Sequence, residues 1–546
     1  MSKRENRDNF LIQGTILGVA SIAVRLIGVL YRVPLTGIIG DMGNGYYSSA
    51  YNIYAMILLI SSYSIPLAVS RILSERLARK EYKNAHRIMI GAMIYAIIVG
   101  SIGAMAAYLF APYIIPANMS RGALALKVLA PTIFFSAILG VFRGYFQGHN
   151  TMVPTSVSQI YEQIINAIGS VAAAYIFTKA VAGDSLLVAE LGAAGGAVGT
   201  GLGVITAMLY LIFCYCRHRG NIHDQYNLED KTDKIESYGS IIKLIFLTVT
   251  PVIFSSFIFN VNSTVDQYLY SFIMGLKGFG EEAIASWYGV YGTKYLVIIG
   301  VPVALAAAIS TAVVPSIVLT LGEQDKRKIY EKIDLTILYT MLISIPSAVG
   351  MGVLAKPILY VLFGAEIDLA AELLNWGSIT IIFTALSTVT NSVLQGIGRL
   401  HEPVKNAAIS LVVHCIFVVV ILFSTEWNLH VLVMGTLVFG VVMCYLNERS
   451  LVRAIQYHQN IKYTMILPLV ASLIMGVFTY FSYRLLAIIL PVNRIGCIIG
   501  IAFSVMVSIV VYAIALVRLH VLNEVILAEI PMGIGIIKVF KKCNFL

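Results

Sequence analysis

Long apolar stretches separated by short polar connections run from one end of the chain to the other. About fourteen of these stretches have the length, around 20 residues, that a helix needs to cross the hydrocarbon core of a bilayer. The pattern therefore predicts an all-α polytopic membrane protein, with spans near 10–38, 46–72, 88–111, 123–147, 153–178, 186–215, 240–273, 285–320, 334–362, 370–396, 404–424, 429–447, 463–487 and 495–518.

The longest polar connection, 217–238, follows the sixth stretch, and weak self-similarity appears on either side of it. The dipeptide Gln-Gly at 147–148 recurs at 395–396, and a proline follows each within seven residues. Repeated lobes are a common plan among transporters. The sequence predicts the following parts: an N-terminal lobe of six helices (1–216), a cytoplasmic linker (217–239), a C-terminal lobe of six helices (240–448), two further helices (449–520) and an interfacial tail (521–546).

Composition supports this interpretation and excludes several others. Hydrophobic residues make up 58% of the 546 positions, charged residues only 12%, and the mean hydropathy is +0.84. A soluble domain carries about 25% charged residues. The first stretch follows a short charged segment that has no small-residue cleavage site, so we expect no removable signal peptide. The six cysteines lack metal-site or redox spacing, and neither a metal nor a cofactor is expected.

Basic residues predict the orientation in the membrane. Four of the 38 lysines and arginines (Arg25, Arg32, Arg71 and Lys294) are placed within spans, and those near a span end are assigned to the adjacent connection. The two termini and the even-numbered connections then hold 27, and the odd-numbered connections only 7. By the positive-inside rule both termini are cytoplasmic, in a multi-pass protein of the plasma membrane. The net charge of +10 is then mainly a matter of topology, and it does not indicate nucleic-acid binding.

Two arginines, Arg25 and Arg32, lie inside the first apolar stretch. They are about 10 Å apart along a helix and project from nearly the same face. An arginine at mid-depth costs roughly 2.5–3.5 kcal/mol and normally faces protein or a water-filled cavity. Arg25 is the deeper residue and predicts a cavity role. Arg32 precedes Pro34 near the outer end, where it can either reach a headgroup or line the cavity.

Three other charged residues lie within apolar stretches. Lys294 is in the eighth, Glu162 shares one face of the fifth with other polar residues, and Asp266 is in the seventh. A buried carboxyl must be protonated, paired or bound to a cation. Two interpretations of Asp266 stay open: a partner for Asn262 one turn away, or a site for Na⁺ or H⁺ that couples transport. Glu162 is a second candidate for ion coupling.

Three segments resemble a known family. They are VFRGYFQGHNTMVPTSVSQIYEQIINAI at 141–168, SIPLAVSRILSER at 64–76 and SWYGVYGTKYLVIIGVPVALAAAISTAVVPSIV at 286–318. All three are similar to SpoVB/YtgP-type polysaccharide flippases of the multidrug/oligosaccharidyl-lipid/polysaccharide (MOP) exporter superfamily, which includes MurJ-like proteins. The resemblance implies a MATE/MurJ-like inverted V of two six-helix lobes plus two C-terminal helices. It also implies alternating access and a cationic central cavity.

The resemblance also implies which residues bind substrate. Arg25 falls where MurJ-like proteins carry a cavity arginine, Arg32 lies near a second one but is one residue out of register, and Lys294 takes the place of a basic residue of the eighth helix. The arginine pair expected midway along the second helix is absent, and Ser61 and Ser62 stand near there. A lipid-linked saccharide pyrophosphate is the implied ligand of Arg25, Arg32 and Lys294.

Three functions are weighed. The first is a flippase that moves an undecaprenyl-pyrophosphate-linked peptidoglycan precursor or polysaccharide unit from the inner to the outer leaflet; arginine and lysine supply the charge that pyrophosphate needs. The second is a cation-coupled multidrug exporter of the same superfamily, which would favour acidic residues such as Glu162 and Asp266. The third is a polytopic lipid-sugar glycosyltransferase, an enzyme that needs an acidic base in an external loop, where the first loop offers only Asp41.

Overall fold

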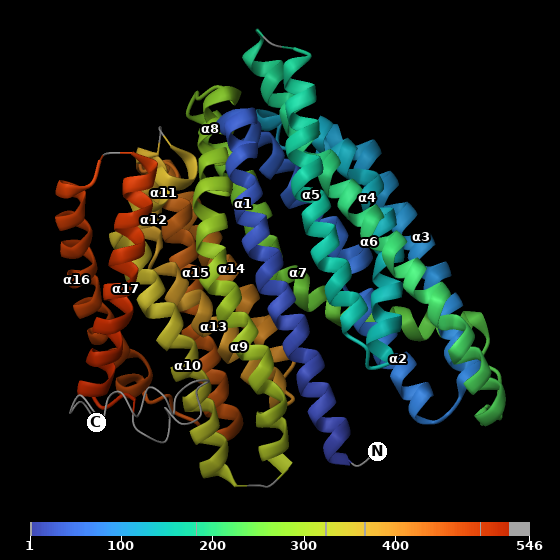
Figure 1. The fold of residues 1–546 in the computed structure, drawn as a ribbon. Coiled ribbons are helices and arrows are strands. Elements are labelled where there is room, and N and C mark those ends of the chain that lie inside the picture. The colour runs from blue at the N-terminus through green and yellow to red at the C-terminus, as the bar shows by residue number, and fades with distance from the viewer. Residues whose placement is uncertain (1–2, 182, 323–324, 365–366, 492, 523–546) are drawn as a thin grey trace. The chain divides into compact units, whose positions relative to one another are not determined.

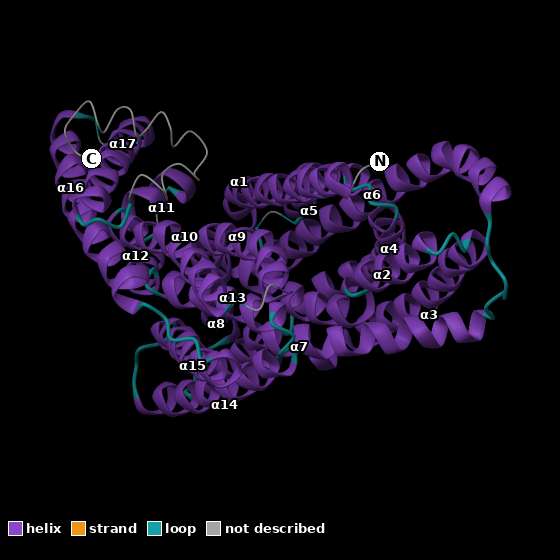
Figure 2. Ribbon diagram, turned by 90° about the horizontal axis from the view of Figure 1, so that it is seen from below, coloured by secondary structure: helices purple, strands orange, loops and turns teal. Residues whose placement is uncertain are grey.

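The computed structural model describes residues 3–181, 183–322, 325–364, 367–491 and 493–522. Helices make up nearly all of this part of the chain, and it contains no strand (Figures 1 and 2). The helices in chain order are α1 (Lys3–Leu58), α2 (Ile65–Ala78), α3 (Tyr82–Ile114), α4 (Gly122–Gly148), α5 (Val153–Lys179), α6 (Ser185–Glu229), α7 (Tyr238–Leu276), α8 (Glu281–Gly289), α9 (Leu296–Gly322), α10 (Lys326–Val353), α11 (Ala355–Phe363), α12 (Asp368–Gly377), α13 (Thr380–Gly396), α14 (His401–Ser424), α15 (His430–Ile455), α16 (Leu467–Ile489) and α17 (Arg494–Arg518).

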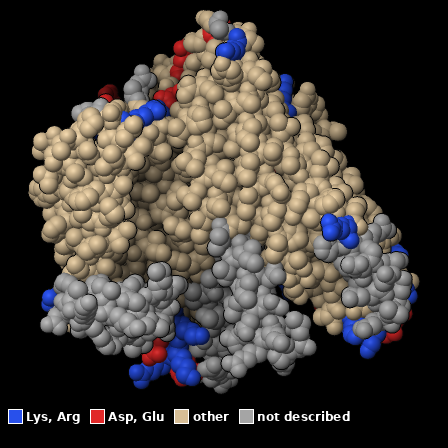
Figure 3. All heavy atoms as spheres, viewed as in Figure 1, with Lys and Arg blue, Asp and Glu red and all other residues tan. Residues whose placement is uncertain are grey.

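Every predicted span lies on helical residues apart from Leu429 and short breaks at Ser64, Leu354 and 378–379. In the described part of the chain, 11 helices are long and apolar enough to cross a membrane, or 12 if the bent pair α12–α13 forms one span. The first two predicted stretches are joined in α1, which is interrupted at Gly40, where φ is 67°. Glycine adopts this left-handed conformation without steric cost. On the face seen in Figure 3, the charged side chains gather toward the two ends of the helices. The protein is a multi-pass membrane protein.

The chain divides into two compact units, Met1–Thr293 and Lys294–Leu546. The boundary falls inside a π-helical turn, η3 (Val290–Tyr295), and α7 and α8 therefore belong to the first unit. The lobes predicted from the repeat, 1–216 and 240–448, are defined by sequence and remain a prediction. Residues 523–546 of the predicted interfacial tail lie outside the described residues.

Helix ends follow the spacing of the sequence repeat. The helix α4 ends at Gly148 and α5 begins at Val153, while α13 ends at Gly396 and α14 begins at His401. Both pairs of ends are 248 residues apart. The tight turn between two helices and the Gln-Gly dipeptide therefore recur at the same interval along the chain.

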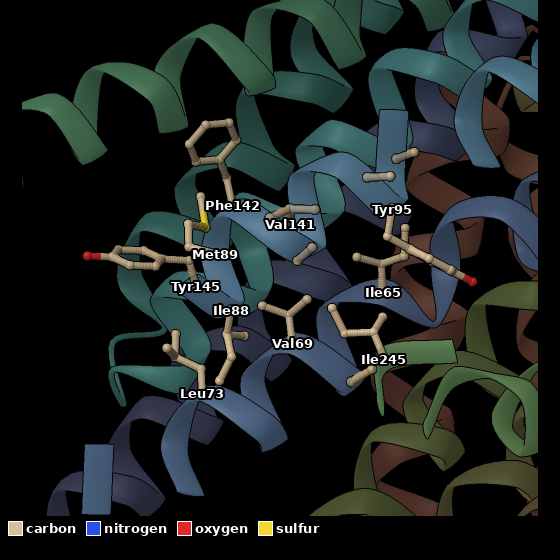
Figure 4. Packing of buried hydrophobic residues seen from close by; sticks show 14 of the residues in the cluster. Ile65, Val69, Leu73, Ile88, Met89, Tyr95, Val141, Phe142, Tyr145 and Ile245 are labelled. Atoms are coloured by element: carbon tan, nitrogen blue, oxygen red, sulfur yellow. The ribbon is translucent and has the colours of Figure 1, made fainter. Parts of the chain in front are cut away.

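An apolar core holds α2, α3, α4, α6 and α7 together in the first unit (Figure 4). Small residues add close contacts between helices to this core. Such contacts are usual in membranes, because lipid is as apolar as the side chains and the hydrophobic effect does not drive helices together there. A Cβ added at Gly199 of α6 would lie 2.2 Å from the backbone nitrogen of Ser170 of α5. A Cβ at Gly203 would lie 2.4 Å from the Glu162 carbonyl oxygen. The backbones of α5 and α6 are thus nearly in contact.

A second seam of glycines joins α8 to the second half of α1. A Cβ at Gly45 would lie 1.9 Å from the carbonyl oxygen of Ala285, and one at Gly289 would lie 1.8 Å from that of Asp41. Side chains larger than hydrogen have no room at either position, because the neighbouring atoms belong to the backbone. The seam fixes α8 within the first unit.

The predicted linker is largely a continuation of α6, which extends to Glu229. Its last residues return to the start of α3, where the Asp230 carboxylate accepts hydrogen bonds from the backbone of Tyr82 (3.0 Å) and Lys83 (3.3 Å). The first N–H groups of a helix have no partner within the helix and carry partial positive charge. An ion pair of 2.7 Å between Arg76 and Glu236 binds the same segment to α2. The linker therefore caps α3 from a distance in sequence.

The second unit contains a buried polar network near the ends of α13 and α15. The side-chain amide of Asn447 donates to Thr390 (2.9 Å) and Asn391 (2.8 Å), and its oxygen accepts from Asn406 (2.9 Å). Asn447 is fully buried. Buried amide groups need such partners, and this network fixes the positions of α13, α14 and α15 relative to one another.

Candidate functional site

The first half of α1 presents its two arginines on the face turned toward α5. Gly28 lies between them, and a Cβ added there would be 3.3 Å from the side-chain nitrogen of Gln163 on α5. Arg25, three residues earlier, is exposed, and it forms no ion pair with another residue of the described chain. Arg32, four residues later, is half-buried. The cation that the sequence places deepest in the first span is therefore accessible.

Tyrosine hydroxyls surround Arg32. Its guanidinium hydrogen-bonds the hydroxyl of Tyr31 and lies within electrostatic reach of Tyr47 and Tyr51. The rings of Tyr47 and Tyr51 are stacked with centroids 5.8 Å apart, and Tyr54 continues the row at 5.7 Å. These three tyrosines come from the part of α1 beyond the Gly40 break. Tyr31, Tyr47 and Tyr51 give Arg32 neutral polar neighbours, and no carboxylate of the described residues forms an ion pair with it.

Glu162 has a cationic partner that the sequence did not reveal. Its carboxylate lies 2.6 Å from a terminal guanidinium nitrogen of Arg143, near the end of α4. The Nε of Arg143 donates to the Ser158 hydroxyl, one turn before Glu162 on α5, at 3.3 Å. The available signal was a cation and an anion in adjacent spans, each expensive alone. Glu162 is thus an ion-pair member in this structure, and its proposed part in ion coupling stays a prediction.

Asp266 of α7 is 2% exposed and sits beside a network that joins α7 to α1. The neighbouring Gln267 accepts a hydrogen bond from Asn52 (2.9 Å) and donates to the Ser49 hydroxyl (2.6 Å). One turn before Asp266, the side-chain oxygen of Asn262 is buried and has no hydrogen-bond partner among the described residues. Carboxylate and amide oxygens are the ligands that hard cations prefer.

Lys294, the predicted cation of the eighth span, belongs to the second unit and is 4% exposed. It lies in η3, and its ammonium is 6.0 Å from the ring centroid of Phe363. Single π-helical turns inside longer helices frequently mark functional positions. A second π-helical turn, η1 (Leu59–Tyr63), holds Ser61 and Ser62. These serine hydroxyls are buried and 3.2 Å apart.

The structure therefore keeps four of the five predicted residues, Arg25, Arg32, Glu162 and Asp266, within the first unit. It joins Glu162 to Arg143, which the prediction did not include. The described residues hold no group of three or more histidine, cysteine or acidic side chains suited to a metal ion.

Two family models match the chain. The model described as polysaccharide biosynthesis protein covers residues 11–320, more than half of the sequence, and the MatE model covers 251–420. Lipid II flippase MurJ of Bacillus subtilis (strain 168) is 24% identical over 494 residues, which are 86% of this chain and 87% of that protein. Stage V sporulation protein B of the same organism is 22% identical over 363 residues, 66% of this chain and 68% of the relative.

Solved structures show the same fold. An inward closed conformation of lipid II flippase MurJ matches with a TM-score of 0.65 at 16% identity, covering 92% of this chain and 99% of that one. An inward-facing MATE family transporter of the MOP superfamily matches with a TM-score of 0.59 at 15% identity, covering 80% and 99%. The chain therefore belongs to the polysaccharide biosynthesis protein family, and it has the fold of the MurJ and MATE membrane transporters.

Proposed function

We propose that the protein is a flippase, which carries a lipid-linked saccharide pyrophosphate from the inner to the outer leaflet of the plasma membrane by alternating access. The exposed Arg25 carries this proposal, because it is a cation inside an apolar span with no ion-pair partner among the described residues. An unneutralised arginine at this depth calls for an anionic ligand. The likeness to lipid II flippase MurJ along most of the chain supports the same class of substrate.

We assign the pyrophosphate to Arg25, with Arg32 and Lys294 as further cations. Guanidinium groups bind phosphate oxygens in a two-bond fork, and these bonds strengthen in a low-dielectric cavity. The tyrosine hydroxyls around Arg32 leave its charge available for the same anion. The prenyl chain of the substrate can stay in the lipid while the charged headgroup crosses.

Asp266 is our candidate for ion coupling. It is buried beside Asn262, whose side-chain oxygen has no hydrogen-bond partner among the described residues. Na⁺ or H⁺ bound there would return the empty carrier, and the membrane potential supplies about 2.3 kcal/mol per charge per 100 mV. A cation-coupled multidrug exporter would use similar acidic residues, and this alternative is favoured by the MatE match at 251–420.

The orientation is part of the proposal. We infer cytoplasmic termini and a cytoplasmic 217–239 linker from the 27-to-7 distribution of basic residues. Single cysteines placed in the linker of a cysteine-free variant should resist a membrane-impermeant maleimide in intact cells and react after lysis. Labelling in intact cells would refute this topology.

The direct test is transport in proteoliposomes. The full-length protein is reconstituted with a fluorescent prenyl-pyrophosphate-linked disaccharide, and dithionite quenching reports its movement between leaflets. Loss of a charge-assisted contact costs about 1.5–3 kcal/mol. Arg25→Ala should therefore slow flipping roughly 10- to 150-fold. Arg25→Lys should recover part of the rate because it keeps the charge and loses the fork.

Two outcomes decide between the functions. The flippase is supported if the wild type flips the probe and Arg25→Ala, with normal yield and elution volume, flips it at least about 10-fold more slowly. Export of cationic dyes with no movement of the lipid probe, or full flipping by Arg25→Ala, would overturn it. Depletion of the protein in cells should also lead to accumulation of a lipid-linked saccharide on the cytoplasmic side.

A further inference from the structure

We propose that Arg143 is an additional anion-binding residue of the first unit, which receives the diphosphate of a prenyl-diphosphate carrier, and that Glu162 is an internal counter-ion which the substrate displaces. This inference rests on the proposed flippase function. It adds a residue that the sequence did not single out and gives Glu162 a role other than ion binding.

The ion pair lies within the spanning helices, near the end at which α4 gives way to α5. Arg143 is five residues before the end of α4, about 7.5 Å along the helix axis. Glu162 is nine residues after the start of α5, about 13.5 Å along its axis. Both termini of this turn are on the side predicted to be cytoplasmic. The pair is thus placed at the depth that a headgroup from the inner leaflet reaches first.

Both side chains are partly accessible, at 17% for Arg143 and 30% for Glu162. The carboxylate contacts one terminal nitrogen of the guanidinium at 2.6 Å, and Ser158 takes the Nε hydrogen at 3.3 Å. A guanidinium has five N–H donors, so this arrangement leaves donors for further oxygen atoms. A diphosphate has more charge and more oxygens than a carboxylate, and it can occupy the fork that Glu162 fills with one bond.

The position connects with the arginines of α1. Residue 163, next to Glu162, is the glutamine whose side chain meets Gly28, and Arg25 lies one turn away from Gly28 on the same face of α1. The polar residues of α5 therefore lie between Arg143 on α4 and Arg25 on α1. Arg32 follows about 10 Å further along α1. A diphosphate released from Arg143 has a second cation one helix away.

A purely structural ion pair is the competing explanation, and the chain supplies one for comparison. Arg121, the residue before α4, and Glu190, in the first turns of α6, form a contact of 2.7 Å with side chains 34% and 23% exposed. This contact is at the end of α4 opposite to its turn with α5. By the predicted topology, this pair lies at the outer side of the membrane. It serves as a matched control, because its geometry resembles that of the Arg143–Glu162 pair but it lies at the other side of the membrane.

The experiment measures binding of geranyl diphosphate, a short-chain prenyl diphosphate, to the purified full-length protein by calorimetry at low ionic strength. Glu162→Gln keeps the size and hydrogen bonding of the side chain but removes the competing charge, so the Kd should fall at least fivefold. Arg143→Gln should raise the Kd at least tenfold, and Arg143→Lys should give an intermediate value. The double variant Arg121→Gln/Glu190→Gln should leave the Kd unchanged.

The outcomes separate this inference from the proposed function. If the wild type does not bind geranyl diphosphate, the proposed function and this inference both fail. If the wild type binds and Arg25→Ala weakens binding, but Glu162→Gln binds no more tightly, only this inference is overturned. Where Arg143→Gln does not fold, Arg143→Gln/Glu162→Gln leaves no unpaired charge; loss of binding by this variant supports the proposal, and wild-type binding refutes it.

Discussion

The glycine seam between α1 and α8 leads to a quantitative prediction for Gly45→Ala. The added Cβ would lie 1.9 Å from the carbonyl oxygen of Ala285, whereas ordinary contact begins at 3.4 Å. The two helices must therefore separate by about 1.5 Å along this direction. A gap of only 0.5–1 Å already forfeits a quarter to a half of the dispersion energy of the atoms concerned.

A control in the same helix isolates this effect. Gly37 has nothing within 4 Å of an added Cβ. Both substitutions gain the helix preference of alanine over glycine, about 0.5–1 kcal/mol, so this gain cancels in the comparison. The remaining difference is the overpacking cost, typically about 1–3 kcal/mol. We expect the upper end of that range at Gly45, because the clashing atom belongs to a helix backbone and cannot rotate away.

Thermal unfolding of the purified variants in one detergent, followed by size-exclusion fluorescence, provides the assay. Gly45→Ala should lower the midpoint by several degrees relative to Gly37→Ala, which should equal or exceed the wild type. Gly289→Ala should behave like Gly45→Ala, since its Cβ would lie 1.8 Å from a backbone oxygen. Equal midpoints for Gly45→Ala and Gly37→Ala would refute the close contact on which the reasoning depends.

Three further predictions follow from the polar contacts. Burial raises the pKa of the Asp230 carboxyl, but hydrogen bonds from Thr232 and Lys83 outweigh it and hold the pKa below the ordinary 3.8. The stability that this contact gives the linker should therefore be complete above the ordinary pKa and lost as the pH falls through the lowered native one. Asp230→Asn should expose the linker to limited proteolysis at neutral pH, and a linker as resistant as that of the wild type would contradict this. Asn447→Ala leaves several buried groups without their hydrogen-bond partner and should lower the free energy of unfolding by about 1–3 kcal/mol. An unchanged melting midpoint would contradict this prediction. Asp266→Asn should remove the response of transport to a sodium or proton gradient, and an undiminished response would rule out its coupling role.

Properties that depend on a single helix were predictable from the sequence. The apolar stretches have the length that a bilayer requires, so each predicted span falls almost entirely on helical residues. The turn between α4 and α5 carries its own glycine and proline signals, and α4 ends at Gly148 as these indicate. Asp266 is buried, in agreement with its position inside an apolar stretch. The prediction that Arg25 faces a cavity agrees with its exposure but remains a prediction.

Contacts between distant helices were not predictable. The ion pair of Arg143 and Glu162 depends on how α4 and α5 are rotated about their axes, and a single sequence does not specify that rotation. The seam of Gly45 and Gly289 joins residues 244 positions apart, and neither glycine differs locally from the many others in the spans. Packing assigns α7 and α8 to the first unit, and the lobes predicted from the repeat remain a prediction.

The seam between α1 and α8 has a consequence for synthesis of the protein on the ribosome. Six helices and the linker emerge by residue 239, but the α1 surface around Gly45 stays uncovered until α8 has been made, and the first unit ends only at Thr293. At about 5–20 residues per second, the nascent chain spends roughly 3–11 s in this incomplete state. A glycine-lined helix surface is open during that interval to lipids, to the translocon and to quality-control proteases. A chain stopped after the linker should be degraded quickly, whereas one that extends through η3 should persist.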